Sequence, residues 1–419
     1  MQVNAINFNI VSSNLGINRA KTRFYNKQDE NNNTADIKAR NIVYKIDNDK
    51  LNINIPYMTA QIIDKTPKDP LNMSDPANFK FRMYDAELQI GDIGLSSYMR
   101  EQLQNDPKGK LSDLRIVCVS GNRLRFEGKM KIGFLNVPFK LDGSIKAVPG
   151  NLLKFTPDKI NIYGISVKKF MDTFGLEIGN IAKISDSGGR FFSLGDSIYM
   201  VPNKFTSEPS LEGKVSDVKT EGGNLSIIYS QNSEGKMPSI FNKDSSNYVK
   251  LVSHNNLLFE GIRLKDADVI LNDKTPNTPL DFTDSNERLQ KVNSGEIGIS
   301  QPVLEKMVVS QMGSNNPIKN LQVNLKPGHT EIKGKYWGIF PISVSMFFDK
   351  SPNGELMLTP KKAELLGFIP LPKSLIKKTL QESLNGTVYG DGVTVPMSDI
   401  ELSPLKQVIN RANELILRM

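Results

Sequence analysis

The sequence predicts an α+β fold built from two tandem copies of one module, each a long antiparallel sheet with amphipathic helices. Three observations predict this fold. Prolines and glycines recur at one spacing in both halves, apolar and polar residues alternate over long stretches, and apolar residues at helical spacing follow those stretches. A chain of 419 residues is long enough for two or three domains.

The repeat is clearest in the spacing of prolines and glycines. Four residues in each half are separated by 11, 8 and 7 positions: Pro138, Pro149, Pro157 and Gly164, and Pro341, Pro352, Pro360 and Gly367. The shift is 203 at all four positions. Flanking segments also resemble each other, with Gly91–Ser96 aligned to Gly295–Ser300 and Glu127–Lys129 to Lys333–Lys335. We therefore predict a first module at residues 1–184, a linker rich in Gly, Ser and Pro at 185–210, and a second module at 211–419.

Alternation of apolar and polar residues predicts the strands. The apolar face of the first copy carries Leu124, Phe126, Met130, Ile132, Val137, Phe139 and Leu141, and that of the second carries Ile342, Val344, Met346 and Phe348. Charged or hydroxyl residues lie between them, so each strand has one dry and one solvated face. The segment 349–354 ends in Asn-Gly and predicts a hairpin turn. One-sided burial is typical of antiparallel sheets.

Helices are predicted where apolar residues recur every three or four positions. The expected segments are 96–104, 300–312, a stretch with Val167, Phe170, Met171 and Phe174, and a stretch after Pro372 with Leu375, Ile376, Thr379 and Leu380. The clearest helical stripe is at the C-terminus: Leu405, Val408, Ile409, Ala412, Leu415, Ile416 and Met419. That helix either packs on its own sheet or contacts a partner or a membrane.

The composition argues against an enzyme. The single cysteine, Cys118, excludes an intrachain disulfide and a zinc site built from cysteines, and two histidines leave little for His-dependent catalysis. No catalytic, metal-binding or phosphate-binding motif is assembled, so we predict no catalytic residue, no cofactor and no metal. The net charge of +8 permits an anionic partner. Nucleic acid is not favoured, because Glu127 interrupts the basic strand face and no aromatic residue lies within it.

The N-terminal residues lack the pattern of a signal peptide, and no apolar stretch reaches the roughly 18 residues of a membrane span. The default expectation is a cytoplasmic protein. Export without a classical signal stays open.

The tandem modules, the Gly-Lys pairs at 128–129 and 334–335, and the segment Gly367–Pro372 that leads into a helix resemble the tubular lipid-binding (TULIP) superfamily. This group includes bactericidal/permeability-increasing protein and the LmeA-like phospholipid-binding family. The resemblance covers roughly residues 84–180 and 264–390. It implies curved sheets wrapped on amphipathic helices, with a phospholipid or fatty-acyl lipid held in an apolar groove between sheet and helix, without chemistry.

The resemblance implies lipid contacts from the dry faces. The candidates are Ile132, Phe139, Leu141, Phe170 and Phe174 in the first module, and Ile342, Val344, Met346, Leu375 and Ile376 in the second. For each residue the competing interpretation is ordinary core. Lysines near the helices (Lys168, Lys169, Lys373, Lys377 and Lys378) either meet the headgroups of an anionic membrane surface or form a solvated helix face. The alternative function is a structural or interaction protein with the same duplicated module, a filled core and no ligand.

Overall fold

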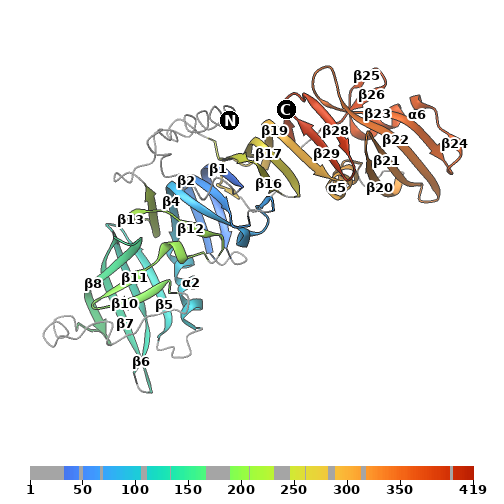
Figure 1. Ribbon diagram of the computed structural model, residues 1–419. Helices are drawn as coiled ribbons and strands as arrows, with labels where there is room; N and C mark the ends of the chain where they lie inside the picture. The colour runs from blue at the N-terminus through green and yellow to red at the C-terminus, as the bar shows by residue number, and fades with distance from the viewer. Residues whose placement is uncertain are drawn as a thin grey trace, which may run out of the picture.

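The structure, a computed structural model, is built mainly of antiparallel strands. It describes residues 33–46, 51–66, 69–104, 111–132, 134–166, 189–206, 208–230, 246–259, 261–281, 288–312, 318–396 and 400–419. Strands hold 66% and helices 12% of these described residues. The strands form a central sheet of 15 strands and two outer sheets of seven strands each. Figure 1 shows the central sheet between the two outer sheets.

The main path of the central sheet has the order β13-β14-β4-β2-β1-β15-β17-β19-β29-β28. These strands are β1 (Thr34–Ile46), β2 (Leu51–Asp64), β4 (Phe79–Gly91), β13 (Val215–Glu221), β14 (Asn224–Ser230), β15 (Tyr248–His254), β17 (Ile262–Asp273), β19 (Arg288–Ser300), β28 (Gln407–Arg411) and β29 (Glu414–Arg418). Five short strands also belong to this sheet but lie off its main path: β3 (Leu71–Asn72), β12 (Ser210–Glu212), β16 (Asn256–Phe259), β18 (Leu280–Asp281) and β27 (Ile400–Leu402).

The central sheet is symmetric in its topology about the antiparallel pair β1–β15. On either side lie two long strands and then a hairpin, β13–β14 in the first half and β28–β29 in the second. The short strands follow the same symmetry. β12 and β27 run parallel to β4 and β19, while β3 and β18 cross to pair with β16 and β1 of the opposite half. The two halves are therefore joined by backbone pairing along one continuous sheet.

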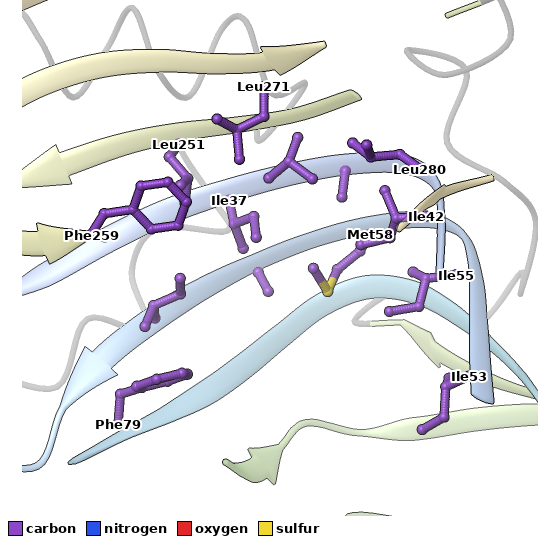
Figure 2. Close-up of a cluster of buried hydrophobic side chains, with 14 of the residues drawn as sticks. Ile37, Ile42, Ile53, Ile55, Met58, Phe79, Leu251, Phe259, Leu271 and Leu280 are labelled. Carbon is purple, nitrogen blue, oxygen red and sulfur yellow. The ribbon is translucent and has the colours of Figure 1, made fainter. Parts of the chain in front are cut away.

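One apolar face of the central sheet holds the two halves together. Figure 2 shows Ile37 and Met58 of the first half beside Leu251, Leu271 and Phe259 of the second. Ile37 lies between Ala35 and Ala39 on β1, and all three side chains are buried. Burial of such side chains contributes about 1.5–3 kcal/mol each, so this face stabilises the junction strongly.

Each half carries one outer sheet. The first has the order β10-β11-β8-β7-β6-β5 and the second β20-β21-β22-β23-β26-β25, with β9 and β24 paired to β8 and β23. The first comprises β5 (Leu111–Val119), β6 (Arg123–Ile132), β7 (Leu135–Val148), β8 (Leu152–Ile162), β9 (Ile165–Ser166), β10 (Phe191–Leu194) and β11 (Ser197–Met200). The second comprises β20 (Ile318–Lys326), β21 (His329–Tyr336), β22 (Phe340–Lys350), β23 (Leu356–Leu365), β24 (Ile369–Pro370), β25 (Val388–Tyr389) and β26 (Gly392–Thr394).

Among the described residues there are three α-helices, all near segments that the sequence predicts as helical: α2 (Asp92–Gln104), α5 (Gln301–Met312) and α6 (Lys373–Leu384). Two 3-10 turns complete the elements, η3 (Pro76–Asn78) and η4 (Pro202–Lys204). The segment predicted as a helix around Val167 lies outside the described residues.

The predicted fold class, α+β with curved sheets wrapped on amphipathic helices, is wrong. The fold is mainly β, and each helix is only 12 or 13 residues long. Much of the buried apolar surface lies on the central sheet, which the sequence did not indicate as one continuous structure. Pairing between residues more than 200 positions apart, such as Thr34 with His254, leaves no local signal in a sequence.

The predicted C-terminal helix is also wrong, because this segment forms the hairpin β28–β29. Asn413 has φ of 65°, a left-handed conformation that Asn tolerates in a hairpin turn. In β29, Leu415, Ile416 and Leu417 are all fully buried. A strand covered on both faces needs consecutive apolar residues, and such a run can be mistaken for part of a helical stripe.

The predicted linker at 185–210 differs from the structure in its described part. Strands β10 and β11 lie in this segment and extend the first outer sheet through pairing of β11 with β8. The hairpin β13–β14, which the prediction gave to the second module, pairs with β4 of the first half. The first half therefore continues at least to Ser230.

The repeated proline spacing has a structural counterpart at each of two sites. The carbonyl of Pro138 accepts a hydrogen bond from the N–H of Tyr163 at 2.9 Å, and that of Pro341 accepts one from Leu366 at 2.8 Å. Pro157 and Pro360 both lie opposite irregularities in strand register. A proline cannot donate to the strand ladder, so both lie where the ladder is already interrupted.

The flanking alignment of Gly91–Ser96 with Gly295–Ser300 does not hold in the structure. Asp92 is the first residue of α2, and its N–H donates to the carbonyl of Gly223 in the β13–β14 turn at 2.8 Å. The counterpart of Asp92 is Gln301, the first residue of α5, whose N–H donates to the carbonyl of Asn413 in the β28–β29 turn at 2.9 Å. Gly295 lies inside β19 instead.

Candidate functional site

A cavity of about 390 Å³ lies between the second outer sheet and helices α5 and α6. Strands β20 to β23 line it with Ile318, Leu321, Ile332, Tyr336, Ile342, Val344, Met346, Phe348, Leu356, Leu358 and Leu365. The helices add Leu304, Met307, Val308, Leu375, Ile376, Thr379, Leu380 and Leu384, and flanking segments add Ile299, Leu371, Val395 and Pro396.

The lining is almost entirely hydrocarbon. Only Tyr336 and Thr379 carry a polar side-chain group. The hydroxyl of Thr379 donates to the carbonyl of Leu375 at 3.0 Å, within its own helix. A ligand inside the cavity therefore meets few groups that could bind a sugar, a nucleotide or an ion, and apolar cavities of this kind do not retain water well.

Strand β22 places three of the predicted lipid contacts in the cavity. Ile342, Val344 and Met346 alternate along the strand and share its inner face. Ser343 and Ser345 lie between them on the outer face, where the Ser343 hydroxyl lies 3.3 Å from the Glu331 carboxylate. The three residues that alternation placed on one face of this strand therefore all line the cavity, and their contact with a lipid stays a prediction.

Helix α6 brings the other two predicted second-module contacts, Leu375 and Ile376, to the cavity. Pro372 precedes the helix, and its carbonyl accepts the N–H of Leu375 at 3.0 Å. Asn385 ends the helix in a left-handed conformation. Ile376 is buried whereas Leu375 is 51% exposed, so Leu375 lies where the cavity opens to solvent.

Helix α5 is fixed over the edge of the second outer sheet by side-chain hydrogen bonds. Glu305 accepts the N–H of Val323 at 2.8 Å, and the Gln301 side chain accepts that of Leu325 at 2.9 Å. Both amides belong to β20, which ends the sheet on that side. The helix thereby satisfies backbone groups of an edge strand and holds Leu304 against the cavity.

The two first-module candidates whose side chains the structure describes, Phe139 and Leu141, do not line this cavity. Leu141 is buried in the core and Phe139 is partly buried against it. Phe170 and Phe174 lie outside the described residues, as does the side chain of Ile132. Phe126 pairs with Leu141 on the neighbouring strand of the first outer sheet, and its ring packs on that of Phe155 with centroids 4.7 Å apart.

Sequence reasoning missed the contribution of α5 and β20. Leu304, Met307 and Val308 have the three- and four-residue spacing of an apolar helix face, so their pattern could have identified them. Ile318 and Leu321 lie on a strand, where alternation is the signal to look for. A bulge in β20 between Lys319 and Gln322 interrupts that alternation, so the sequence pattern could not have identified them.

The candidate lysines are solvent-facing or bound to nearby groups. Lys373 and Lys378 are exposed, and Lys378 lies 3.9 Å from Glu382 one helical turn away. Lys377 donates to the carbonyl of Gly390 at 3.0 Å. Lys168 and Lys169 lie outside the described residues.

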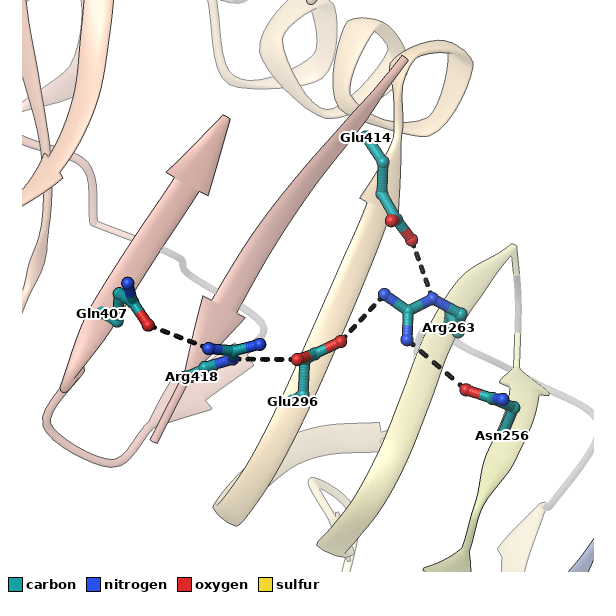
Figure 3. A network of polar contacts seen from close by, with 6 residues as sticks. All are labelled: Asn256, Arg263, Glu296, Gln407, Glu414 and Arg418. Carbon is teal, nitrogen blue, oxygen red and sulfur yellow. Dashed lines mark hydrogen bonds and ion pairs between the residues drawn. The ribbon is translucent and has the colours of Figure 1, made fainter. Parts of the chain in front are cut away.

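Six polar residues form a hydrogen-bonded network on the central sheet, shown in Figure 3. Glu296 accepts hydrogen bonds from Arg418 at 2.9 Å and from Arg263 at 3.1 Å, and Arg263 also donates to Glu414 at 2.8 Å. Burial alone would raise the pKa of Glu296, but the two arginines outweigh it and hold the pKa below its ordinary value of 4.5. A carboxylate held ionised between two arginines fastens β29 to the sheet and is a poor proton donor or acceptor near neutral pH.

Cys118 is poorly suited to nucleophilic chemistry. Its side chain is buried, and burial, together with the nearby Asp92, raises the pKa of the thiol to about 12. Within the described ranges no three His, Cys, Asp or Glu side chains are grouped closely enough to hold a metal ion. The apolar cavity is therefore the feature best suited to binding.

Comparisons with known proteins identify no relative: no family model, no curated protein and no solved structure matches this chain. Of the helices that the structure describes, none has the length and apolar character needed to cross a membrane.

Proposed function

We propose that this protein binds an acyl-chain lipid, a phospholipid or a fatty acid, in the cavity between the second outer sheet and helices α5 and α6. The observation that carries the proposal is the lining, in which every residue except Tyr336 and Thr379 has an apolar side chain. The volume of about 390 Å³ lies within the roughly 300–1,000 Å³ of ligand pockets. The proposal includes no chemical step.

The hydrophobic effect supplies the affinity. Each buried CH₂ group contributes about 0.8 kcal/mol, so part of one acyl chain suffices for tight binding. The chain would occupy the space between Val344, Met346 and Ile376, and the headgroup would remain near Leu375, where the cavity opens. Lys373 is exposed and precedes Leu375 by two residues, and its charge suits an anionic headgroup.

A related proposal concerns the origin of the two halves. Their shared strand order and the matching hydrogen bonds at Pro138 and Pro341 support descent from one duplicated unit. The resemblance to the tubular lipid-binding superfamily stays a hypothesis about function, supported by the cavity and not by the predicted wrapping of sheets on helices.

The test compares the affinity of the wild type and of the variant Val344→Trp for a fluorescent fatty acid. Val344 lies on the inner face of β22, so the larger ring fills space that the acyl chain would take. Displacing about two CH₂ groups, at about 0.8 kcal/mol each, weakens binding by at least about tenfold. The matched control is Ser345→Trp, which adds the same ring on the opposite face of the strand and should bind like the wild type.

Equal binding by both variants and the wild type would refute the cavity as the site. Thermal unfolding of each variant shows whether a loss of binding reflects loss of fold. No uptake by the wild-type protein would favour the alternative, an interaction protein whose function does not require a ligand in this cavity.

A further inference from the structure

We propose that the two outer sheets end in lipid-docking tips, so that one molecule bridges two lipid surfaces. This inference concerns residues outside the cavity and does not require the proposed function. The first tip is formed by Phe134, Leu135, Tyr163 and Ile165, and the second by Trp337, Ile339, Phe368 and Ile369. These large apolar side chains are between 39% and 91% exposed.

Each tip gathers two neighbouring turns. In the first outer sheet, the β6–β7 turn lies beside the β8–β9 turn, because Tyr163 donates its N–H to Pro138 near the start of β7. In the second, the β21–β22 and β23–β24 turns meet in the same way through Leu366 and Pro341. The apolar side chains of each tip therefore lie together.

The backbone of the tips is strained in a way that marks the side chains as functional. Twelve described residues other than glycine have a positive φ, and nine of them are Asn or Asp, which tolerate this conformation. The other three are Tyr163, Trp337 and Leu366, with φ of 56°, 48° and 57°, and all three lie in tip turns. Turns at the opposite ends of the first sheet's strands use Asn122 and Asn151 instead. Bulky apolar residues thus occupy strained positions where Asn would fit, which indicates a use for their side chains.

The charge around the tips favours an anionic lipid surface as the occupant. Between Glu127 and Asp142 the chain has three lysines and no carboxylate, and between Glu331 and Asp349 it has two lysines and no carboxylate. Three of these lysines form ion pairs: Lys129 with Asp113, Lys140 with Glu127 and Lys333 with Glu331. Lys131 and Lys335 are exposed behind their tips. Exposed aromatic rings ahead of lysines suit the interface of an anionic membrane, where rings enter the headgroup region and lysines meet the phosphates.

The symmetry of the central sheet places one tip on each half. Figure 1 shows the β6 hairpin and the β24 region at the two ends of the molecule, with the central sheet between them. A molecule with a docking tip at both ends can hold two vesicles at once. At the second tip, Trp337 also stacks on Tyr336, which lines the cavity, with ring centroids 5.0 Å apart.

The test uses vesicles of phosphatidylcholine mixed with phosphatidylserine, with co-sedimentation to measure binding and light scattering to measure clustering. The wild type should bind and cluster them. Phe134→Ser with Tyr163→Ser removes the first tip, and Trp337→Ser with Phe368→Ser removes the second. Each pair should abolish clustering and weaken binding by about tenfold or less, because the other tip remains. All four substitutions together should abolish binding.

The matched control is Ile93→Ser with Leu194→Ser, which removes two equally exposed apolar side chains away from the tips and should cluster vesicles like the wild type. Val344→Trp should also cluster vesicles normally, which separates failure of the tips from failure of the cavity. Clustering that survives removal of one tip, or binding that survives removal of both, would overturn the proposal in favour of another surface. A wild type that does not bind vesicles would overturn it as well.

Discussion

At the scale of single residues, Glu296 makes the clearest electrostatic contribution to stability. Its side chain is 16% exposed and accepts from two arginines on neighbouring strands. Glu296→Gln removes the charge that both arginines contact. Hydrogen bonds to charged groups contribute about 1.5–3 kcal/mol, so we expect the free energy of unfolding in urea at neutral pH to fall by about 2 kcal/mol.

The pH dependence follows from the lowered pKa of Glu296. Its stabilisation is present above the ordinary value of 4.5 and is lost as the pH falls through the lower pKa of the folded state. The difference between wild type and Glu296→Gln should therefore shrink below pH 4.5. Glu401→Gln is the control, because Glu401 pairs with Lys291 at an exposed position and should contribute little. A difference that persists unchanged in acid would show that the effect is not due to the charge.

Only some of the residues that line the cavity can be predicted from the sequence. Alternation alone assigned Ile342, Val344 and Met346 to one face, because side chains on a strand point to opposite sides in turn. It could not show that this face borders an empty space in the second half. Whether a face is filled depends on side chains that pack from other elements.

At the scale of elements, the attachment of α5 to β20 controls the wall of the cavity. Glu305→Ala leaves the N–H of Val323, a residue 1% exposed, without its acceptor. An unpaired buried donor costs about 1–3 kcal/mol. We expect faster hydrogen exchange at the Val323 amide and weaker fatty-acid binding as the helix loosens.

Glu305→Gln is the conservative control, since its amide oxygen can still accept the hydrogen bond. It should restore slow exchange at Val323. Equal exchange rates in the alanine variant and the wild type would mean that packing of Leu304 and Val308, and not this hydrogen bond, holds the helix in place.

Local signals predicted some elements well and one badly. Pro372 before α6 and the Asn-Gly turn after β22 are short-range features, so α6 and the β22–β23 hairpin are where the sequence places them. The C-terminal segment has the same spacing of apolar residues as a helix. The left-handed turn at Asn413 and pairing of β29 with distant β19 decide its structure, and neither is visible in periodicity.

At the scale of the whole molecule, the sequence contains a pair of identical short segments that the proline spacing did not reveal. Asp64-Lys65-Thr66 and Asp273-Lys274-Thr275 are identical, and each Asp accepts hydrogen bonds from the backbone and hydroxyl of its Thr. Each Asp also accepts from an Asn side chain just before the first strand of its half, Asn33 or Asn247. A search for short identical segments would have found this pair, which matches the end of β2 with the end of β17.

The continuous central sheet was beyond such a search. Its pairing of β1 with β15 joins residues separated by more than 200 positions, and its energetics depend on an apolar face shared by both halves. A sequence records that the face of each strand is apolar. It does not record which other strand lies beside it.

Lipid binding is tested most directly by the mass of the purified protein under native conditions, measured before and after extraction with organic solvent. The lining of the cavity predicts a reproducible mass above that of the polypeptide, which disappears on extraction and matches a lipid in the extract. Val344→Trp should lack it and Ser345→Trp should keep it. A wild-type mass equal to that of the polypeptide, together with no uptake of added fatty acid, would contradict lipid binding.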